Sequence, residues 1–409
     1  MPLSNAEHEA LLCPSRRAFL ASAGAFVAWA NLPTFALAAG RDPRLVVVIL
    51  RGAMDGLAVV PPVGDPDYVS LRGDLAIGAP GLGEVLPLDG FFALNDAMPL
   101  LHARYKQGKA VIFHAASTSY RERSHFEGQD VLESGLERPL NAPSGWLNRA
   151  VTALPTREGI RPTTALAITQ TVPLILRGPA PTLTWTPARF QPLSGDTAQR
   201  LLDLYTHVDP ELARVFQEGV SVDMLAGSGR AEKRSGAVGG DFKELATAAA
   251  KLLSTPDGPR VGALSYDGWD THVKEGPGDG RLAKLLGALD DSLQALAEGL
   301  GSVWSDTVVL VVTEFGRTAR ENGADGTDHG TATTAFLLGG AVNGGRVIAD
   351  WPGLKEKQLY EARDLAPTTD LRAVFKGVLR DHLGLSERVL DTDIFPGSIG
   401  VRPLDDLLA

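Results

Sequence analysis

The sequence is short of cysteine, of basic residues and of nucleotide-binding glycine motifs. Cys13 is the only cysteine among 409 residues, and it lies in a segment that resembles a removable leader, so a mature chain would form no disulfide and no thiolate metal site. Lys and Arg number 39 against 49 Asp and Glu, a net charge of −10, which argues against a nucleic-acid surface because such a surface needs a basic face. No G-x-G-x-x-G follows the first predicted strand, so a redox enzyme has no support either.

The clearest signal lies in the first 38 residues. The segment SRRAFL at 15–20 resembles the bacterial twin-arginine export motif, and an apolar, Ala-rich stretch leads from it to the small-x-small cleavage site Ala36-Leu37-Ala38. A membrane anchor is the alternative, but Asn31 and Pro33 interrupt the apolar run, so no stable spanning helix is expected after cleavage. We therefore predict a twin-arginine signal peptide over 1–38. The twin-arginine translocase would then deliver the chain to the periplasm or the cell exterior.

Buried strands and amphipathic helices alternate along the rest of the chain. LVVVIL at 45–50 is an unbroken apolar run, which is typical of a strand buried on both faces. Further strands are predicted at 110–114, 260–266, 307–313 and 334–338, and helices at 96–106, 124–133, 242–253, 281–300 and 369–383. This alternation predicts an α/β fold with a mostly parallel central sheet covered by helices on both faces. We expect a single domain over 39–409, with an inserted segment around 155–240 that contains short strands over 160–200, helices over 197–217 and a loop over 226–240.

Side chains of metal-ligand type follow several of these strands. They are Asp55 after 45–50, Asp270 and His272 after 260–266, Glu314 directly after 307–313, and Asp328 with His329 beyond a Gly-rich loop. Open α/β sheets build their sites beyond the carboxyl ends of the strands, and a divalent cation such as Zn²⁺, Mn²⁺ or Mg²⁺ needs ligands from several segments. We therefore predict that these six side chains bind one divalent metal. Each has an ordinary alternative: an Asx-turn for Asp55, a surface ion pair for Glu314, and loop hydrogen bonds for the others.

Ser124 and His125 open the predicted helix that follows 110–114. Ser124 is either the N-cap of that helix or a nucleophile, because a helix N-terminus offers free N–H groups and positive potential to an anionic oxygen. Arg51, Arg121, Arg123 and Arg317 lie beside the polar segments and could grip a phosphate or sulfate, with exposed ion pairing as the alternative. Ser124, His125, Arg51 and Arg123 are the predicted catalytic residues.

Several motifs in register resemble one family. They are LVVVILRGAMDGL, RSHFEGQDVLESG, GWDTH, TEFGRT, TDHGTA and DLAPTTDLRAVF, and together they resemble the domain of unknown function 1501 family from about Leu45 to Phe395. That family is grouped by similarity with the alkaline phosphatase superfamily, which holds one or two divalent metals at strand ends beside a Ser or Thr nucleophile. The resemblance implies that Asp55 is the first-strand ligand, that Ser124 or a neighbour lies near the nucleophile, and that Asp270 and His272 form an Asp/His pair.

The same resemblance places Glu314 where the superfamily has the Asp of an Asp-His-Gly motif, and His329 as the last histidine ligand. Asp328-His329-Gly330 could itself be that motif. Two features depart from the pattern. Only Thr271 separates Asp270 from His272, where three residues are usual, and Phe315 follows Glu314 where a histidine ligand is expected.

The sequence thus predicts an exported, metal-dependent hydrolase that acts on phosphate or sulfate esters of a small molecule or a polymer. A non-catalytic envelope protein on a phosphatase-like scaffold, which binds a polymer or an assembly partner, is the alternative. Phe315 in place of a histidine favours this alternative, as does the lack of a clearly marked nucleophile.

Overall fold

The computed structural model describes residues 41–154, 165–169, 171–186, 240–256 and 258–409, with single positions at Leu202, Tyr205, Asp209 and Ala213. The predicted signal peptide lies outside these residues, as do most of the predicted helices over 197–217 and the loop up to Gly240. The division into a leader and one domain with an inserted segment therefore stays a prediction. No helix within the described ranges is long and apolar enough to cross a membrane.

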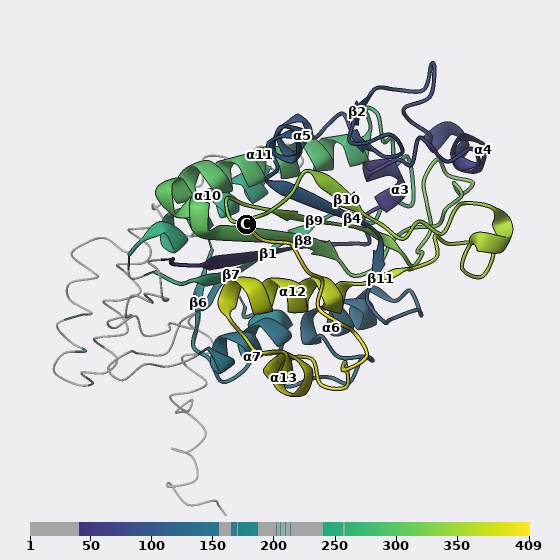
Figure 1. Ribbon diagram of the computed structural model, residues 1–409. Helices are drawn as coiled ribbons and strands as arrows, with labels where there is room; N and C mark the ends of the chain where they lie inside the picture. Colours follow the sequence, from purple (N-terminus) through teal and green to yellow (C-terminus); the bar gives the residue numbers. More distant parts are fainter. Residues whose placement is uncertain are drawn as a thin grey trace, which may run out of the picture.

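A mostly parallel sheet runs through the centre of the molecule (Figure 1). In order across the sheet, its strands are β10 (Arg346–Ile348), β4 (Ala110–Ser117), β9 (Thr333–Leu338), β8 (Thr307–Thr313), β1 (Arg44–Arg51), β7 (Val261–Asp267), β5 (Ala165–Ile168) and β6 (Thr182–Trp185), with β11 (Thr369–Asp370) paired to β4. The pairings of this described sheet are parallel except those of β9, which runs antiparallel to β4 and to β8. A small antiparallel hairpin, β2 (Val85–Pro87) with β3 (Ala93–Asn95), stands apart.

Helices cover both faces of the sheet, as the sequence predicts (Figure 1). One face carries α5 (Pro99–Lys106), α10 (Gly240–Ser254) and α11 (Arg281–Leu300), and the other carries α6 (His125–Ser134), α7 (Trp146–Ala153), α12 (Leu371–Leu383) and α13 (Glu387–Val389). Two short helices, α3 (Gly56–Val59) and α4 (Tyr68–Arg72), follow β1. The predicted fold class is confirmed.

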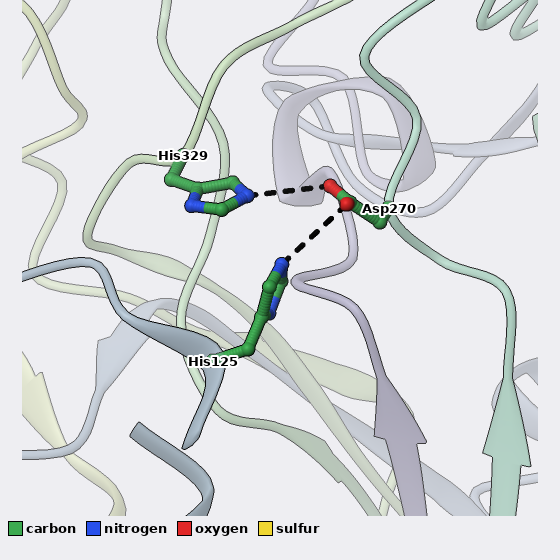
Figure 2. Close-up of side chains that lie close together, drawn as sticks. All are labelled: His125, Asp270 and His329. Atoms are coloured by element: carbon green, nitrogen blue, oxygen red, sulfur yellow. Dashed lines mark hydrogen bonds and ion pairs between the residues drawn. The ribbon is translucent and has the colours of Figure 1, made fainter. Parts of the chain in front are cut away.

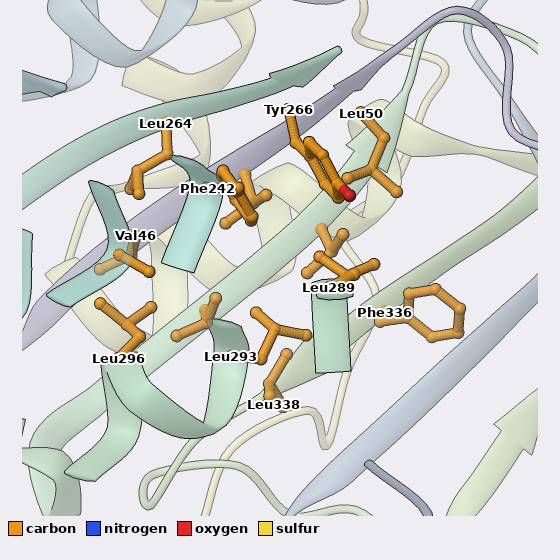
Figure 3. Packing of buried hydrophobic residues seen from close by; sticks show 14 of the residues in the cluster. Val46, Leu50, Phe242, Leu264, Tyr266, Leu289, Leu293, Leu296, Phe336 and Leu338 are labelled. Carbon is orange, nitrogen blue, oxygen red and sulfur yellow. The ribbon is translucent and has the colours of Figure 1, made fainter. Parts of the chain in front are cut away.

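Alternation along β1 explains how one strand serves two cores. Val46, Val48 and Leu50 pack toward α10 and α11, whereas Leu45, Val47 and Ile49 pack toward α7 and α12, because successive side chains of a strand point to opposite faces. Figure 3 shows the first of these cores, in which leucines of α11 meet the sheet. Phe242 stacks on Tyr266 at the edge of that core, with ring centroids 4.4 Å apart.

The reversed direction of β9 decides where the site forms. The ends of the parallel strands β1, β4, β7 and β8 meet at one edge of the sheet, and an antiparallel β9 begins at that same edge. The loop from Glu314 to Ala332 therefore leaves β8 and enters β9 without crossing the sheet. Residues that precede β9 thus join residues that follow the other strands.

Candidate metal centre

Three side chains from separate segments converge at this edge. His125 is the first residue of α6, Asp270 follows β7, and His329 lies shortly before β9. One ligand atom from each lies within 4.8 Å of the other two, so the group could hold a metal ion. In Figure 2 the two imidazoles approach the Asp270 carboxylate from different sides.

His272 adds a third imidazole to the same carboxylate. Its Nε2 lies 3.1 Å from Asp270 Oδ1 and 3.0 Å from His329 Nε2. His329 Nε2 lies 3.3 Å from Asp270 Oδ1, and His125 Nε2 lies 3.6 Å from Oδ2. Ligand atoms about 2.1 Å from a tetrahedral Zn²⁺ are about 3.4 Å from one another, which is close to these four separations. The ligand atoms that all lie within 4.8 Å of one another belong to His125, Asp270 and His329, and His272 adjoins this group through Asp270 and His329. Asp270, His272 and His329 were predicted as ligands, and the structure brings all three together.

Each imidazole is anchored through its other nitrogen. Nδ1 of His125 donates to Glu314 Oε1 at 2.8 Å, Nδ1 of His272 to Asp328 Oδ1 at 3.2 Å, and Nδ1 of His329 to the Arg123 carbonyl at 2.9 Å. Because an acceptor at Nδ1 selects the Nδ1–H tautomer, Nε2 keeps its lone pair and faces Asp270. Metal-binding histidines are held in this way.

The Nε2 atom of His125 is a further indication of a missing ligand. It is buried and has no hydrogen-bond partner among the described residues. His272 and His329 bring their Nε2 atoms to 3.0 Å, and two lone pairs at that distance repel each other. A cation bound by both atoms removes this repulsion, and it would also occupy the free position of His125. The donor set therefore fits a divalent metal.

Glu314 stands behind His125, not among the ligand atoms. Its Oε1 accepts hydrogen bonds from His125, from the Gly52 N–H at 2.9 Å and from Gln129 at 3.1 Å. Burial alone would raise the pKa of Glu314, but these hydrogen bonds outweigh it and lower the pKa, so the carboxylate stays charged. Glu314 and Asp328 were predicted as ligands, and the structure places each on the Nδ1 side of an imidazole. Residue type alone does not distinguish a carboxylate that would bind the metal from one that holds an imidazole.

The turn after β1 requires a glycine at position 52. Gly52 has φ +120, and a Cβ there would lie 2.5 Å from the backbone nitrogen of Asp270. The close approach lets the Gly52 N–H reach Glu314 while the strand ends of β1 and β7 stay in contact.

Asp55 is not brought to this group. Its Oδ1 caps α3 by accepting from Leu57 N–H at 3.0 Å and from Ala58 N–H, and its Oδ2 pairs with the fully buried Arg72 at 2.5 Å. The carboxylate is thus occupied by a helix cap and an ion pair, and the first-strand ligand expected from the resemblance is engaged elsewhere. Glu275 lies against this pair, and burial, followed by the charge of Asp55, raises its pKa well above the usual value.

The predicted anion-binding arginines are also paired. Arg51 donates to Gln129 and to Glu133 Oε1 at 2.6 Å, and Arg123 bonds to Glu361 and Asp364. Their roles in orienting an anion stay predictions. Arg123 adopts φ +61, a left-handed conformation that is strained for a non-glycine residue. Its carbonyl is the group that holds His329.

Arg317 reaches the site from the loop after β8. The side chain is fully buried, and its Nη1 donates to Asp270 Oδ1 at 2.6 Å while Nη2 donates to the Thr327 carbonyl. Burial would raise the pKa of Asp270, but the hydrogen bond from Arg317 overcomes it and lowers the pKa, so Asp270 is ionised. Arg317 therefore fixes Oδ1 of Asp270 and leaves Oδ2 facing His125.

Ser124 occupies the N-cap position of α6, next to His125. Its side chain makes no capping hydrogen bond, and its N–H donates to the Tyr120 hydroxyl at 3.2 Å. Ser124 therefore stands at the N-cap position, but its side chain does not form the capping hydrogen bond. The role of Ser124 as a nucleophile stays a prediction.

Phe315 takes the place beside Glu314 where a second histidine was expected from the resemblance. Its ring stacks on His125, with centroids 5.1 Å apart and planes at 23°, and lies 5.3 Å from His329. An apolar ring offers no ligand atom. This arrangement fits one metal-ion group within the described part of the chain.

The surroundings shift the pKa values of His125 and His329 in opposite directions. The hydrogen bond from His125 to Glu314 raises the pKa of His125, whereas burial, aided by the nearby charges of His125 and Arg317, lowers the pKa of His329. His329 is therefore neutral near pH 7 and ready to donate its lone pair. His125 was assigned to catalysis from the sequence, and its signal as a ligand was its place at the start of the helix after β4.

Comparisons with known proteins find similarity to several solved structures at low sequence identity. No curated protein matches it. It is similar to Ps i-CgsB in complex with k-i-k-neocarrahexaose, at 12% identity and a TM-score of 0.41, over 88% of this chain and 77% of that one. The phosphonate monoester hydrolase of Agrobacterium radiobacter matches at 12% identity and a TM-score of 0.33, over 84% and 74% of the two chains.

A murine ectonucleotide pyrophosphatase/phosphodiesterase 5 matches at 10% identity and a TM-score of 0.30. This match covers 67% of the present chain and 57% of the murine one. At such identities the similarity concerns the fold alone. Residues 116–394, well over half of the chain, match the family described as "Protein of unknown function (DUF1501)", and the chain belongs to that family.

Proposed function

We propose that the protein is an exported, divalent-metal-dependent hydrolase of phosphate or sulfate esters. The observation that carries the proposal is the convergence of three imidazole Nε2 atoms on Asp270, each imidazole anchored at Nδ1 by its own acceptor. A structural histidine needs no such arrangement. The export step rests on the predicted leader.

His125, Asp270, His272 and His329 would hold the metal. Imidazole suits Zn²⁺ better than Mg²⁺, which prefers oxygen ligands and water, so three imidazoles and one carboxylate favour Zn²⁺. The bound ion would polarise the ester oxygen and stabilise the negative charge that develops during hydrolysis.

The chain itself contributes the surroundings of the reacting group. Glu314, Asp328 and the Arg123 carbonyl orient the three imidazoles, and Arg317 orients Asp270. Ser124 lies at the N-terminus of α6, where backbone N–H groups favour an anionic oxygen. We assign the attack on the ester to the Ser124 hydroxyl or to a water held beside it.

Hydrolysis of aryl phosphates, aryl phosphodiesters and aryl sulfates by the full-length protein tests this function. Protein supplied with Zn²⁺ or Mn²⁺ should turn over at least one of these classes, and His125→Ala or His329→Ala should abolish turnover with the fold intact by circular dichroism. His102→Ala is the matched control, because that imidazole is half-buried on α5 and bonds to the Pro87 carbonyl away from the site. Metal-loaded protein that hydrolyses none of these esters would favour a non-catalytic envelope protein.

A further inference from the structure

An open cavity of about 640 Å³ is lined in part by residues that follow His272 and precede Asp328 in the chain. Three chain segments line it: residues 74–83, residues 274–280 and Asp325. Its volume is in the range of small-molecule sites, which span roughly 300–1,000 Å³. Leu75, Ala76 and Ile77 are buried and give it an apolar wall.

Two of these segments continue directly from the residues of the metal centre. Lys274 follows His272 by two residues, and consecutive Cα atoms are about 3.8 Å apart, so the cavity wall begins within about 8 Å of that histidine. The backbone N–H of Lys274 donates to the Ala324 carbonyl at 2.9 Å, and that of Glu275 to Asp325 at 2.8 Å. The segments that carry His272 and Asp328 therefore continue into the lining of the cavity, which contains none of the metal-centre residues themselves.

One exposed apolar side chain lies between the metal centre and the cavity lining in the chain. Val273 lies between His272 and Lys274, and 56% of it is exposed, although valine is usually buried. An organic group joined to a phosphate or sulfate at the metal centre would pass over Val273 before it enters the cavity.

Charge at the cavity restricts what it can accept. Asp74, Asp279 and Asp325 line it against the single cation Lys274, so three carboxylates face one ammonium group. All four are exposed at its rim. The resulting negative potential repels a second anionic group and attracts an amino group.

We propose that this cavity binds the alcohol part of the ester, and that this alcohol is uncharged or carries an amino group. The inference rests on the proposed function and adds the substrate class. Esters that carry several anionic groups, such as polyanionic polymers, would be poor substrates.

Gly278 offers a way to fill the cavity without disturbing the protein. It lines the cavity, and a Cβ built at this position meets no atom within 4 Å. Gly90 has the same open surroundings but does not line the cavity, so Gly90→Trp is the matched control for Gly278→Trp. Asp279→Lys reverses one rim charge at an exposed position.

Binding of four phosphonates to metal-loaded, full-length protein tests the inference by calorimetry. Methylphosphonate reports the metal centre alone, whereas hexylphosphonate, 6-aminohexylphosphonate and 5-carboxypentylphosphonate carry tails long enough to reach the cavity. The aminohexyl compound should bind roughly tenfold more tightly than methylphosphonate, and the carboxypentyl compound more weakly than hexylphosphonate. Gly278→Trp should remove the advantage of the tails and leave methylphosphonate unchanged. Asp279→Lys leaves two carboxylates and two ammonium groups at the rim, so it should remove the preference between the charged tails.

Three results would overturn the inference. If Gly278→Trp and Gly90→Trp bind all four compounds alike, the cavity does not hold the tail, and the proposed function is untouched. A wild-type preference for the carboxypentyl tail contradicts the substrate class. If metal-loaded protein binds none of the phosphonates, methylphosphonate included, the proposed function fails and the inference fails with it.

Discussion

Glu314 Oε1 lies 2.8 Å from His125 Nδ1, so the residue that directly follows β8 fixes the imidazole that begins α6. Because Glu314 is fully buried and accepts from three groups through that oxygen, it has a single position and gives His125 a single tautomer. Glu314→Gln should weaken metal affinity about 10- to 100-fold, as loss of an outer carboxylate does at other metal sites. Calorimetric titration with Zn²⁺ measures this.

Asp290→Asn serves as the control for that experiment. Asp290 is also a buried carboxylate, but it accepts from the backbone N–H groups of Leu100 and Leu101 at the start of α5, away from the site. Its replacement should leave metal affinity unchanged. Equal metal affinity in wild type and Glu314→Gln would contradict the positioning role of Glu314.

Asp55 offers a second prediction, because its ion pair with Arg72 is buried on both sides. Asp55→Asn should keep the helix cap and the metal affinity, yet lower the free energy of unfolding by about 3 kcal/mol, since it leaves a buried guanidinium without its charged partner. Urea unfolding and metal titration of the same variant measure the two effects. A large loss of metal affinity with unchanged stability would restore Asp55 as a ligand.

His382 makes stability depend on pH. Burial lowers its pKa from 6.5 to about 4, and its Nε2 donates to the Arg44 carbonyl at 2.9 Å. Between these pH values the unfolded chain binds the proton and the folded chain does not. The contribution of His382 to stability is therefore present above pH 6.5 and is lost as the pH falls toward 4.

His382→Gln keeps a donor for that carbonyl and removes the titration. The wild type should lose about 3 kcal/mol more than this variant between pH 7 and pH 4, measured by urea unfolding at each pH. Equal losses in the two proteins would show that another group controls the acid sensitivity.

Much of the fold follows from the sequence, because buried strands and amphipathic helices leave clear periodic patterns. The strand at 307–313 and the helix at 281–300 are observed with the predicted bounds, and 45–50 gains one residue at each end as β1. The direction of β9 does not follow in the same way. An apolar strand has the same composition whether it runs parallel or antiparallel. Only the pairing of β9 with β4 and β8 shows its direction.

The sequence predicts only part of the arrangement of the site, again for a physical reason. Strand ends indicate which residues lie at that edge of the sheet, and this is why Asp270, His272 and His329 could be predicted to lie close together. Strand ends do not show which carboxylate would bind an ion and which would hold an imidazole, and this is why the sequence placed Glu314 among the ligands although the structure places it on the Nδ1 side of His125. Asp55 forms an ion pair with Arg72, seventeen residues later, and no local sequence pattern predicts that pair.

Element-resolved metal content of the purified full-length protein is the decisive measurement for the metal centre. We expect one divalent ion per chain, with Zn²⁺ preferred, and loss of that ion in both His125→Ala and His329→Ala but not in His102→Ala. Protein that carries no metal, takes up none when Zn²⁺ or Mn²⁺ is added, and gains no thermal stability from either ion would contradict this expectation.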